Sequence, residues 1–202
     1  MIFSVPNIQN ILKNGMNNGI NFEHTFLVSK NNIEYMLIDS GFKILEIKDY
    51  SPFNLFVCCE KSNIKDIPIV HHEYKENKNI FLTLLKSNIE AIKNINNNMS
   101  DDNFFIFGAH INSQYLFHLG LKEEQFKAIL DNDPAKIGKR LYGTDLSVES
   151  PDILKKYNSS TVILKNGIYN KEIHKQILTI NNSTKVFTWI KAPFVSLVNQ
   201  EM

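Results

Sequence analysis

Two adjacent residues, Glu23 and His24, place a carboxylate beside an imidazole. An imidazole, whose unperturbed pKa is about 6.5, can act as a general base near neutral pH, and a neighbouring carboxylate can orient it. The pair follows a turn that contains Gly19 and precedes a predicted helix. Acid–base chemistry is therefore one interpretation of the pair. From the residues alone, a solvated or helix-capping pair is the favoured interpretation, because residues that are neighbours in sequence need not be in contact.

A second candidate site follows two predicted strands in the C-terminal half. Gly108 comes directly after one apolar run, and Asp131 follows the next run, about 20 residues further on. These are the positions of the phosphate turn and the ribose-binding acid in a dinucleotide-binding fold. His110 and Ser113 occupy the places of the other two glycines of such a turn. A tight strand–helix turn that binds no nucleotide is therefore the favoured interpretation, with a dinucleotide site as the alternative.

A charged loop extends this second site. Asp131, Asp133 and Lys136 lie at the carboxyl end of a predicted strand, which is the edge where open parallel sheets bind ligands. We therefore take Gly108, Asp131 and Lys136 as candidate binding residues. We expect no metal site, because no metal-ligand spacing is shared by the other histidines, which are His71, His72, His110, His118 and His174.

Composition limits the classes of function. The chain has 202 residues, with 22 basic and 21 acidic side chains and a formal net charge of +1, so we expect no nucleic-acid partner. No apolar run approaches the ~20 residues of a membrane span, and no signal segment opens the chain, so we expect no membrane association. Cys58 and Cys59 are adjacent, which would strain a disulfide between them. A reduced, cytoplasmic protein is the simplest expectation.

The elements predicted around the Glu-His pair look like part of a larger sheet. Residues 1–7 predict a short strand, of the kind that is usually one edge of a sheet whose other strands come earlier in sequence. A helix is predicted from an N-cap at Asn31 to a stop at Gly41. Strands 42–48 and 53–59 follow, and the near-continuous apolar character of the second predicts burial on both faces.

The C-terminal half predicts a complete α/β fold. Charged residues 62–76 are interpreted as a linker, and an apolar stripe predicts a long helix over 76–96. Strands and helices then alternate, which predicts a Rossmann-like parallel sheet with helices on both faces. The predicted strands are 104–107, 126–130, 146–148, 161–164 and 185–188. The predicted helices are 110–119, one starting at Ser150-Pro151, and 168–180.

Five short motifs come in a defined order in this half. They are Ile106–Ala109, Leu119–Leu121, Ile129–Lys139 with the pattern D-N-x-P-x-K-x-G-K, Gly143-Thr144 and Ser150-Pro151. The series, covering about residues 70–190, resembles the C-terminal domain of S-adenosylmethionine (SAM)-dependent C-methyltransferases that act on nucleotide-linked deoxysugars.

Residues 1–60 resemble the closing part of the catalytic domain of the same family. The matching segments are Val5-Pro6-Asn7, Phe22-Glu23-His24, a helix ending at Ser40-Gly41-Phe42, and two final strands. The resemblance implies a piece of a class I methyltransferase α/β fold over 1–61, a linker over 62–76 and the C-methyltransferase C-terminal domain over 77–202. It also implies that Glu23 and His24 lie at the active site.

The resemblance implies a reaction in which a base removes a proton next to a keto group and the enolate attacks the SAM methyl group. His24 would be the base, oriented by Glu23, with Tyr35 or Asn21 as neighbours. The substrate would be a nucleotide sugar, and Asn21 joins the candidate substrate-binding residues named above.

The chain departs from the family in one respect. The glycine-rich SAM turn, its acidic partner and the zinc-binding cysteines of many members would lie upstream of Met1, and no G-x-G occurs in the sequence. We therefore expect a truncated or split form that does not bind SAM alone, is inactive alone, and would need an upstream-encoded methyltransferase half. The alternative is a non-catalytic module that binds nucleotide sugars or serves in assembly.

Overall fold

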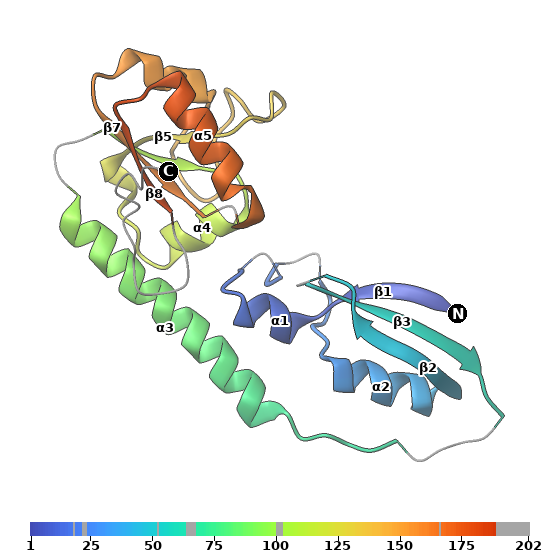
Figure 1. The fold of residues 1–202 in the computed structure, drawn as a ribbon. Coiled ribbons are helices and arrows are strands. Elements are labelled where there is room, and N and C mark those ends of the chain that lie inside the picture. Colours follow the sequence, from blue (N-terminus) through green and yellow to red (C-terminus); the bar gives the residue numbers. More distant parts are fainter. Residues whose placement is uncertain are drawn as a thin grey trace, which may run out of the picture. The chain divides into compact units, whose positions relative to one another are not determined.

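The computed structural model describes residues 1–17, 19–21, 24–51, 53–63, 68–99, 103–165 and 167–188, which belong to two compact units (Figure 1). The units are Met1–Leu84 and Leu85–Met202, and their boundary falls inside helix α3 (Tyr74–Asn98). The sequence predicted this helix over 76–96. The structure confirms it and extends it by two residues at each end. Among the described residues, no helix has both the length and the apolar character needed to cross a bilayer.

The first unit is built on a three-stranded sheet in the order β1-β3-β2 (Figure 1). Strand β3 is antiparallel to both neighbours, with Val57 opposite Phe3 on one side and Ile47 on the other. Strands β1 and β2 therefore run parallel to each other and are joined through helices, with β3 inserted between them. The elements are β1 (Ile2–Pro6), α1 (Ile8–Lys13), α2 (Lys30–Asp39), β2 (Phe42–Asp49) and β3 (Asn54–Lys61).

Only one face of this sheet carries a buried core. Leu55 and Val57 of β3 pack with Ile33 and Leu37 of α2 on that face. On the other face Phe56 is half-buried, and the Lys48 ammonium lies 5.5 Å from the centre of its ring. The prediction that this strand is buried on both faces is therefore wrong, because the described helices cover one face only.

The N-terminus of α2 differs from its prediction by two residues. Ser29 is the N-cap: its hydroxyl accepts from Asn32 N at 3.2 Å, and Asn32 Oδ1 accepts from Ser29 N at 2.9 Å. Asn31, predicted as the cap, instead donates its amide to Glu73 at 2.7 Å. The helix ends as predicted, with Gly41 at φ +78° directly after the C-cap residue.

The Glu73 carboxylate joins three segments of the first unit. Besides Asn31, it accepts from Ser29 Oγ at 2.5 Å and from Gln9 Nε2 at 3.2 Å. Apolar contacts between α1 and the first half of α3 add to this junction, through Ile8, Leu12, Ile80 and Leu84. The end of the predicted linker is thus fixed to the first unit, whereas residues 64–67 of that linker lie outside the described part of the chain.

The second unit confirms the predicted parallel α/β architecture, a Rossmann-like fold. Its five strands are all parallel and lie in the order β6-β5-β4-β7-β8. The strands are β4 (Asn103–Phe107), β5 (Phe126–Leu130), β6 (Val148–Glu149), β7 (Ser160–Leu164) and β8 (Thr184–Thr188). The helices are α4 (Ile111–His118), α5 (Asn170–Ile180) and the 3-10 turns η1 (Glu123–Gln125), η2 (Pro151–Lys156) and η3 (Gly167–Tyr169).

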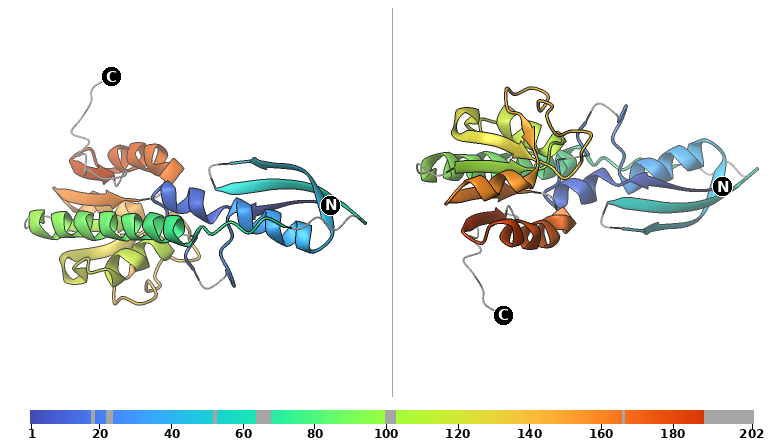
Figure 2. Two further views of the ribbon diagram at one scale, coloured as in Figure 1. Left: turned by 90° about the horizontal axis from the view of Figure 1, so that it is seen from below. Right: turned by 90° about the horizontal axis from the view of Figure 1, so that it is seen from above.

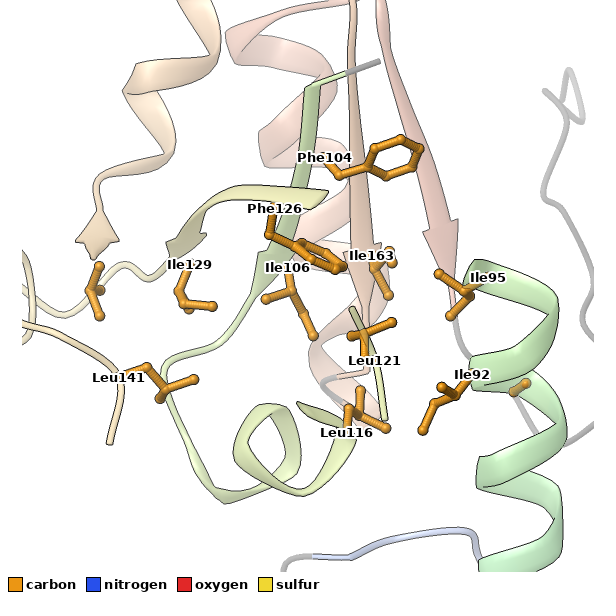
Figure 3. Packing of buried hydrophobic residues seen from close by; sticks show 12 residues of the cluster. Ile92, Ile95, Phe104, Ile106, Leu116, Leu121, Phe126, Ile129, Leu141 and Ile163 are labelled. Carbon is orange, nitrogen blue, oxygen red and sulfur yellow. The ribbon is translucent and has the colours of Figure 1, made fainter. Parts of the chain in front are cut away.

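Helices cover both faces of this sheet (Figure 2). On one face Ile92 and Ile95 of α3 and Leu116 of α4 pack against Ile106 and Ile163 (Figure 3). On the other face, η2 and α5 pack against the alternate side chains of the same strands. This two-sided burial explains why the strand sequences are continuous apolar runs.

Candidate functional site

His24 lines a small pocket at the carboxyl end of β1. The pocket has a volume of about 90 Å³, and its walls come from Pro6, Ile8 and Ile11 together with Gly19 and the segment 26–28. A Cβ built on Gly19 would lie 2.9 Å from Ile11 Cγ2, so glycine lets this wall pack closely. The backbone N–H of His24 donates to the Asn21 carbonyl at 3.4 Å, which closes the preceding turn.

The surroundings of His24 are apolar on the protein side and open on the solvent side. Phe26 and Leu27 are 65% and 45% exposed, so they form an apolar rim beside the imidazole. Among the described residues, the His24 ring forms no hydrogen bond or ion pair. Its nitrogen atoms can therefore take or give a proton to a bound molecule without first breaking a contact within the described structure.

The other residues predicted around His24 are only partly tested by the structure. Glu23 lies outside the described residues. Asn21 contacts His24 through its backbone carbonyl. Tyr35 is 40% exposed on α2 and is not among the residues that line the pocket.

The second candidate site lies in the second unit, where Gly108, Asp131 and Lys136 are brought together as predicted. Asp131 Oδ2 accepts from Ala109 N at 2.7 Å and from Lys136 Nζ at 3.1 Å, and its Oδ1 accepts from Asp133 N at 2.9 Å. The carboxylate thus holds the turn after β4 against the loop after β5. Asn21 and His24, in contrast, belong to the first unit.

The environment of Asp131 favours its ionised form. Burial alone would raise the pKa of this carboxyl, but hydrogen bonds from the backbone N–H groups of Asp133 and Ala109, and the Lys136 ammonium, outweigh burial and lower it. Three of the roughly four acceptor positions of the carboxylate are used within the chain. Asp131 therefore acts as a connector of loops in this structure, with little capacity left for a ribose.

Gly108 is required by its backbone conformation and by a close neighbour. Its φ is +107°, and a Cβ built there would lie 2.2 Å from His110 Nε2. The His110 ring therefore occupies the space over Gly108, through which a phosphate or a dinucleotide would approach the backbone. This turn does not fit SAM or a dinucleotide in the observed conformation, and the first unit has no described glycine-rich strand–helix turn.

A buried polar layer at the same sheet edge was missed from the sequence. Strands β5 and β7 flank β4, so the chain order reverses at β4, and Lys165 directly follows Leu164, the register partner of Phe107. Lys165 Nζ donates to Asn88 Oδ1 at 3.2 Å, and Asn88 is 1% exposed. Burial lowers the pKa of Lys165 from 10.5 to about 8.

Two sequence signals could have identified this layer. Asn88 interrupts the apolar stripe of α3, between Leu84 and Ile92, and Lys165 follows a fully buried strand.

Among the described residues, no three side chains of His, Cys, Asp or Glu type are grouped so that they could hold a metal ion.

No protein-family model and no curated protein sequence matches the chain. One solved structure with similarity is that of RSP, a Rex-family repressor, with a TM-score of 0.34 and 15% sequence identity. The match covers 59% of this chain and 56% of the repressor chain, so this chain spans little more than half of that protein. A likeness at this level carries no argument about function.

Proposed function

We propose that this chain contributes the acid–base part of a SAM-dependent enzyme that methylates a carbon atom of a nucleotide-linked sugar. The observation that carries the proposal is His24, whose imidazole lines a pocket at the end of β1 and is not engaged by any described residue. The succession of elements in the first unit also agrees with the family resemblance: a strand ending at Pro6, the His24 segment, a helix ending before Gly41 and two further strands.

In this proposal His24 removes a proton from the carbon next to a keto group. The apolar walls of the pocket would contact the carbon skeleton of a bound carbon acid, and the imidazole, open on its solvent side, would receive the proton. The described residues do not fit SAM, which supplies the methyl group, so SAM would be bound by residues other than these.

Proton exchange tests the role of His24 without SAM. A keto-sugar nucleotide incubated with the full chain in D₂O should exchange the proton next to its carbonyl group, followed by ¹H NMR. The substitution His24→Ala should slow this exchange by about 10²–10⁴-fold, which is the usual contribution of a positioned general base. The matched control is His72→Ala, at an exposed histidine of the same unit, which should leave the rate unchanged.

Complementation tests the complete reaction. Addition of a SAM-binding methyltransferase half should restore methyl transfer, His24→Ala should remove most of it, and Glu23→Gln should cause a smaller loss because the proton acceptor remains. Full turnover of the His24→Ala variant would show that the base lies elsewhere.

A non-catalytic module that binds nucleotide sugars or serves in assembly is the second candidate. It is favoured by the absence of a G-x-G motif. Because the His110 ring lies over Gly108, such a module would bind its ligand at a place other than this turn. Binding of a nucleotide sugar with no proton exchange, alone or in the complemented enzyme, would support this candidate over the enzyme.

A further inference from the structure

A groove of about 520 Å³ lies between α4, the turn at η1 and the loop that carries Tyr142. This volume is within the usual range of small-molecule sites. The groove belongs wholly to the second unit. It shares no residue with the His24 pocket or with the Asp131 contacts, so any ligand it takes is independent of the proposed function.

The walls of the groove are held in place by hydrogen bonds. The Asn96 side chain donates to the Gly120 carbonyl at 2.9 Å and accepts from Lys122 N at 3.2 Å. On the opposite side, Glu123 Oε1 accepts from Asp145 N at 2.5 Å. A site with fixed walls loses little conformational freedom on binding, which favours measurable affinity for a small ligand.

Two tyrosines from different elements face this groove. Tyr142 is 85% exposed, although Leu141 and Thr144 beside it are buried and anchor its loop. Tyr115 lines the groove from α4. A large aromatic side chain held out into solvent by a fixed loop offers an apolar face for stacking, with a hydroxyl at its tip for hydrogen bonding.

The polar lining provides both donors and acceptors. Gln114 and His118 can each donate and accept hydrogen bonds, Lys122 donates, and Glu124 accepts. With Glu123 also present, the groove has two carboxylates and one ammonium group. The carboxylates disfavour a phosphorylated ligand, and the ammonium disfavours a quaternary amine.

We propose that this groove binds an uncharged sugar ring. A sugar ring combines an apolar C–H face, which would stack on Tyr142, with hydroxyl groups that both donate and accept, which would bond to Gln114 and Glu124. Phosphorylated ligands and quaternary amines could also contact the aromatic faces, but the charges of the groove disfavour them.

Titration of the ¹⁵N-labelled full chain with glucose, galactose, rhamnose and maltose tests the proposal. At least one sugar should cause saturable chemical-shift changes confined to residues 111–124 and 141–145. Tyr142→Ala should weaken binding about tenfold, as expected for the loss of one aromatic contact. Tyr169→Ala, at a 58% exposed tyrosine outside the groove, should leave the affinity unchanged.

Three results would overturn the proposal. They are the absence of saturable shifts with all four sugars, equal binding by the Tyr142→Ala variant, and shifts in the groove caused by tetramethylammonium or thymidine monophosphate in place of sugars. The spectrum of each variant reports whether it is folded, so a loss of binding through misfolding would be recognised.

Discussion

Lys165 should make the stability of the second unit depend on pH in the alkaline range. Burial lowers its pKa from 10.5 to about 8. Below pH 8 both states carry the charge, and the folded state bears the cost of holding it away from water. Between pH 8 and pH 10.5 the unfolded chain binds a proton that the folded chain does not, so the free energy of unfolding rises with pH through this window.

The size of the effect follows from the two pKa values. At about 1.4 kcal/mol for each pKa unit, the full change is about 3 kcal/mol, and roughly 2 kcal/mol of it should be reached at pH 9.5. The substitution Lys165→Met removes the titrating group. Urea unfolding of both proteins, followed by circular dichroism from pH 7 to pH 9.5, should show the wild type gaining about 2 kcal/mol relative to the variant.

The comparison cancels the other titrating groups, because wild type and variant share them. The variant also loses the hydrogen bond to Asn88, but this loss shifts its stability by a similar amount at every pH. The exposed Lys171 provides the control, since Lys171→Met should run parallel to the wild type. If the Lys165→Met curve also runs parallel, Lys165 titrates as a hydrated lysine and the reasoning is refuted.

Three further predictions concern positions described above. Gly108→Ala should destabilise more than Gly120→Ala in urea unfolding, because both glycines have φ near +106° but only the Gly108 position meets a neighbouring ring; equal losses would contradict the steric role of His110. Glu73→Ala should cost about 1–3 kcal/mol by the same assay, since three donors lose their acceptor, whereas the exposed Glu76→Ala should cost less than about 1 kcal/mol. Calorimetry should detect no micromolar binding of SAM to the chain alone. A clear heat of binding would show that the His110 ring over Gly108 and the internal bonds of Asp131 do not prevent SAM from binding.

The parallel sheet was predictable because its strands are marked by local signals. Strand β5 is an apolar run that ends at an aspartate, and β4 is one that ends at a glycine, so the boundaries came out within a residue. The short strand β6 and the 3-10 turn after Ser150 were placed, but with a different length and a different helix type. Local sequence does not encode how far a strand pairs with its neighbour.

The errors arose where local choices are equivalent and the contacts come from distant residues. Ser29 and Asn31 are both good N-cap residues, and Ser29 forms the cap, while Glu73, more than 40 positions away, accepts hydrogen bonds from both side chains. The apolar run of β3 similarly does not reveal that only one face receives a helix.

The candidate sites show the same limit. The proximity of Gly108, Asp131 and Lys136 followed from the rule that carboxyl ends of parallel strands meet at one edge. The position of the His110 ring over Gly108 depends on a side-chain rotamer, and the internal partners of Asp131 depend on the path of a loop. Neither can be inferred from residue types and spacing.

Helix α3 has consequences for how disturbances travel along the chain. Its early turns place Ile80 and Leu84 in one core, and its later turns place Ile92 and Ile95 in another. Each half alone is about as short as the shortest helices that persist in water, so each half depends on the core into which its side chains pack. Loosening of either core should therefore fray α3 from that end toward the boundary at Leu84 and Leu85. The backbone hydrogen bonds at this boundary would be the last in the helix to open. Their exchange rate would therefore report the loss of both cores together, and not the loss of the less stable core alone.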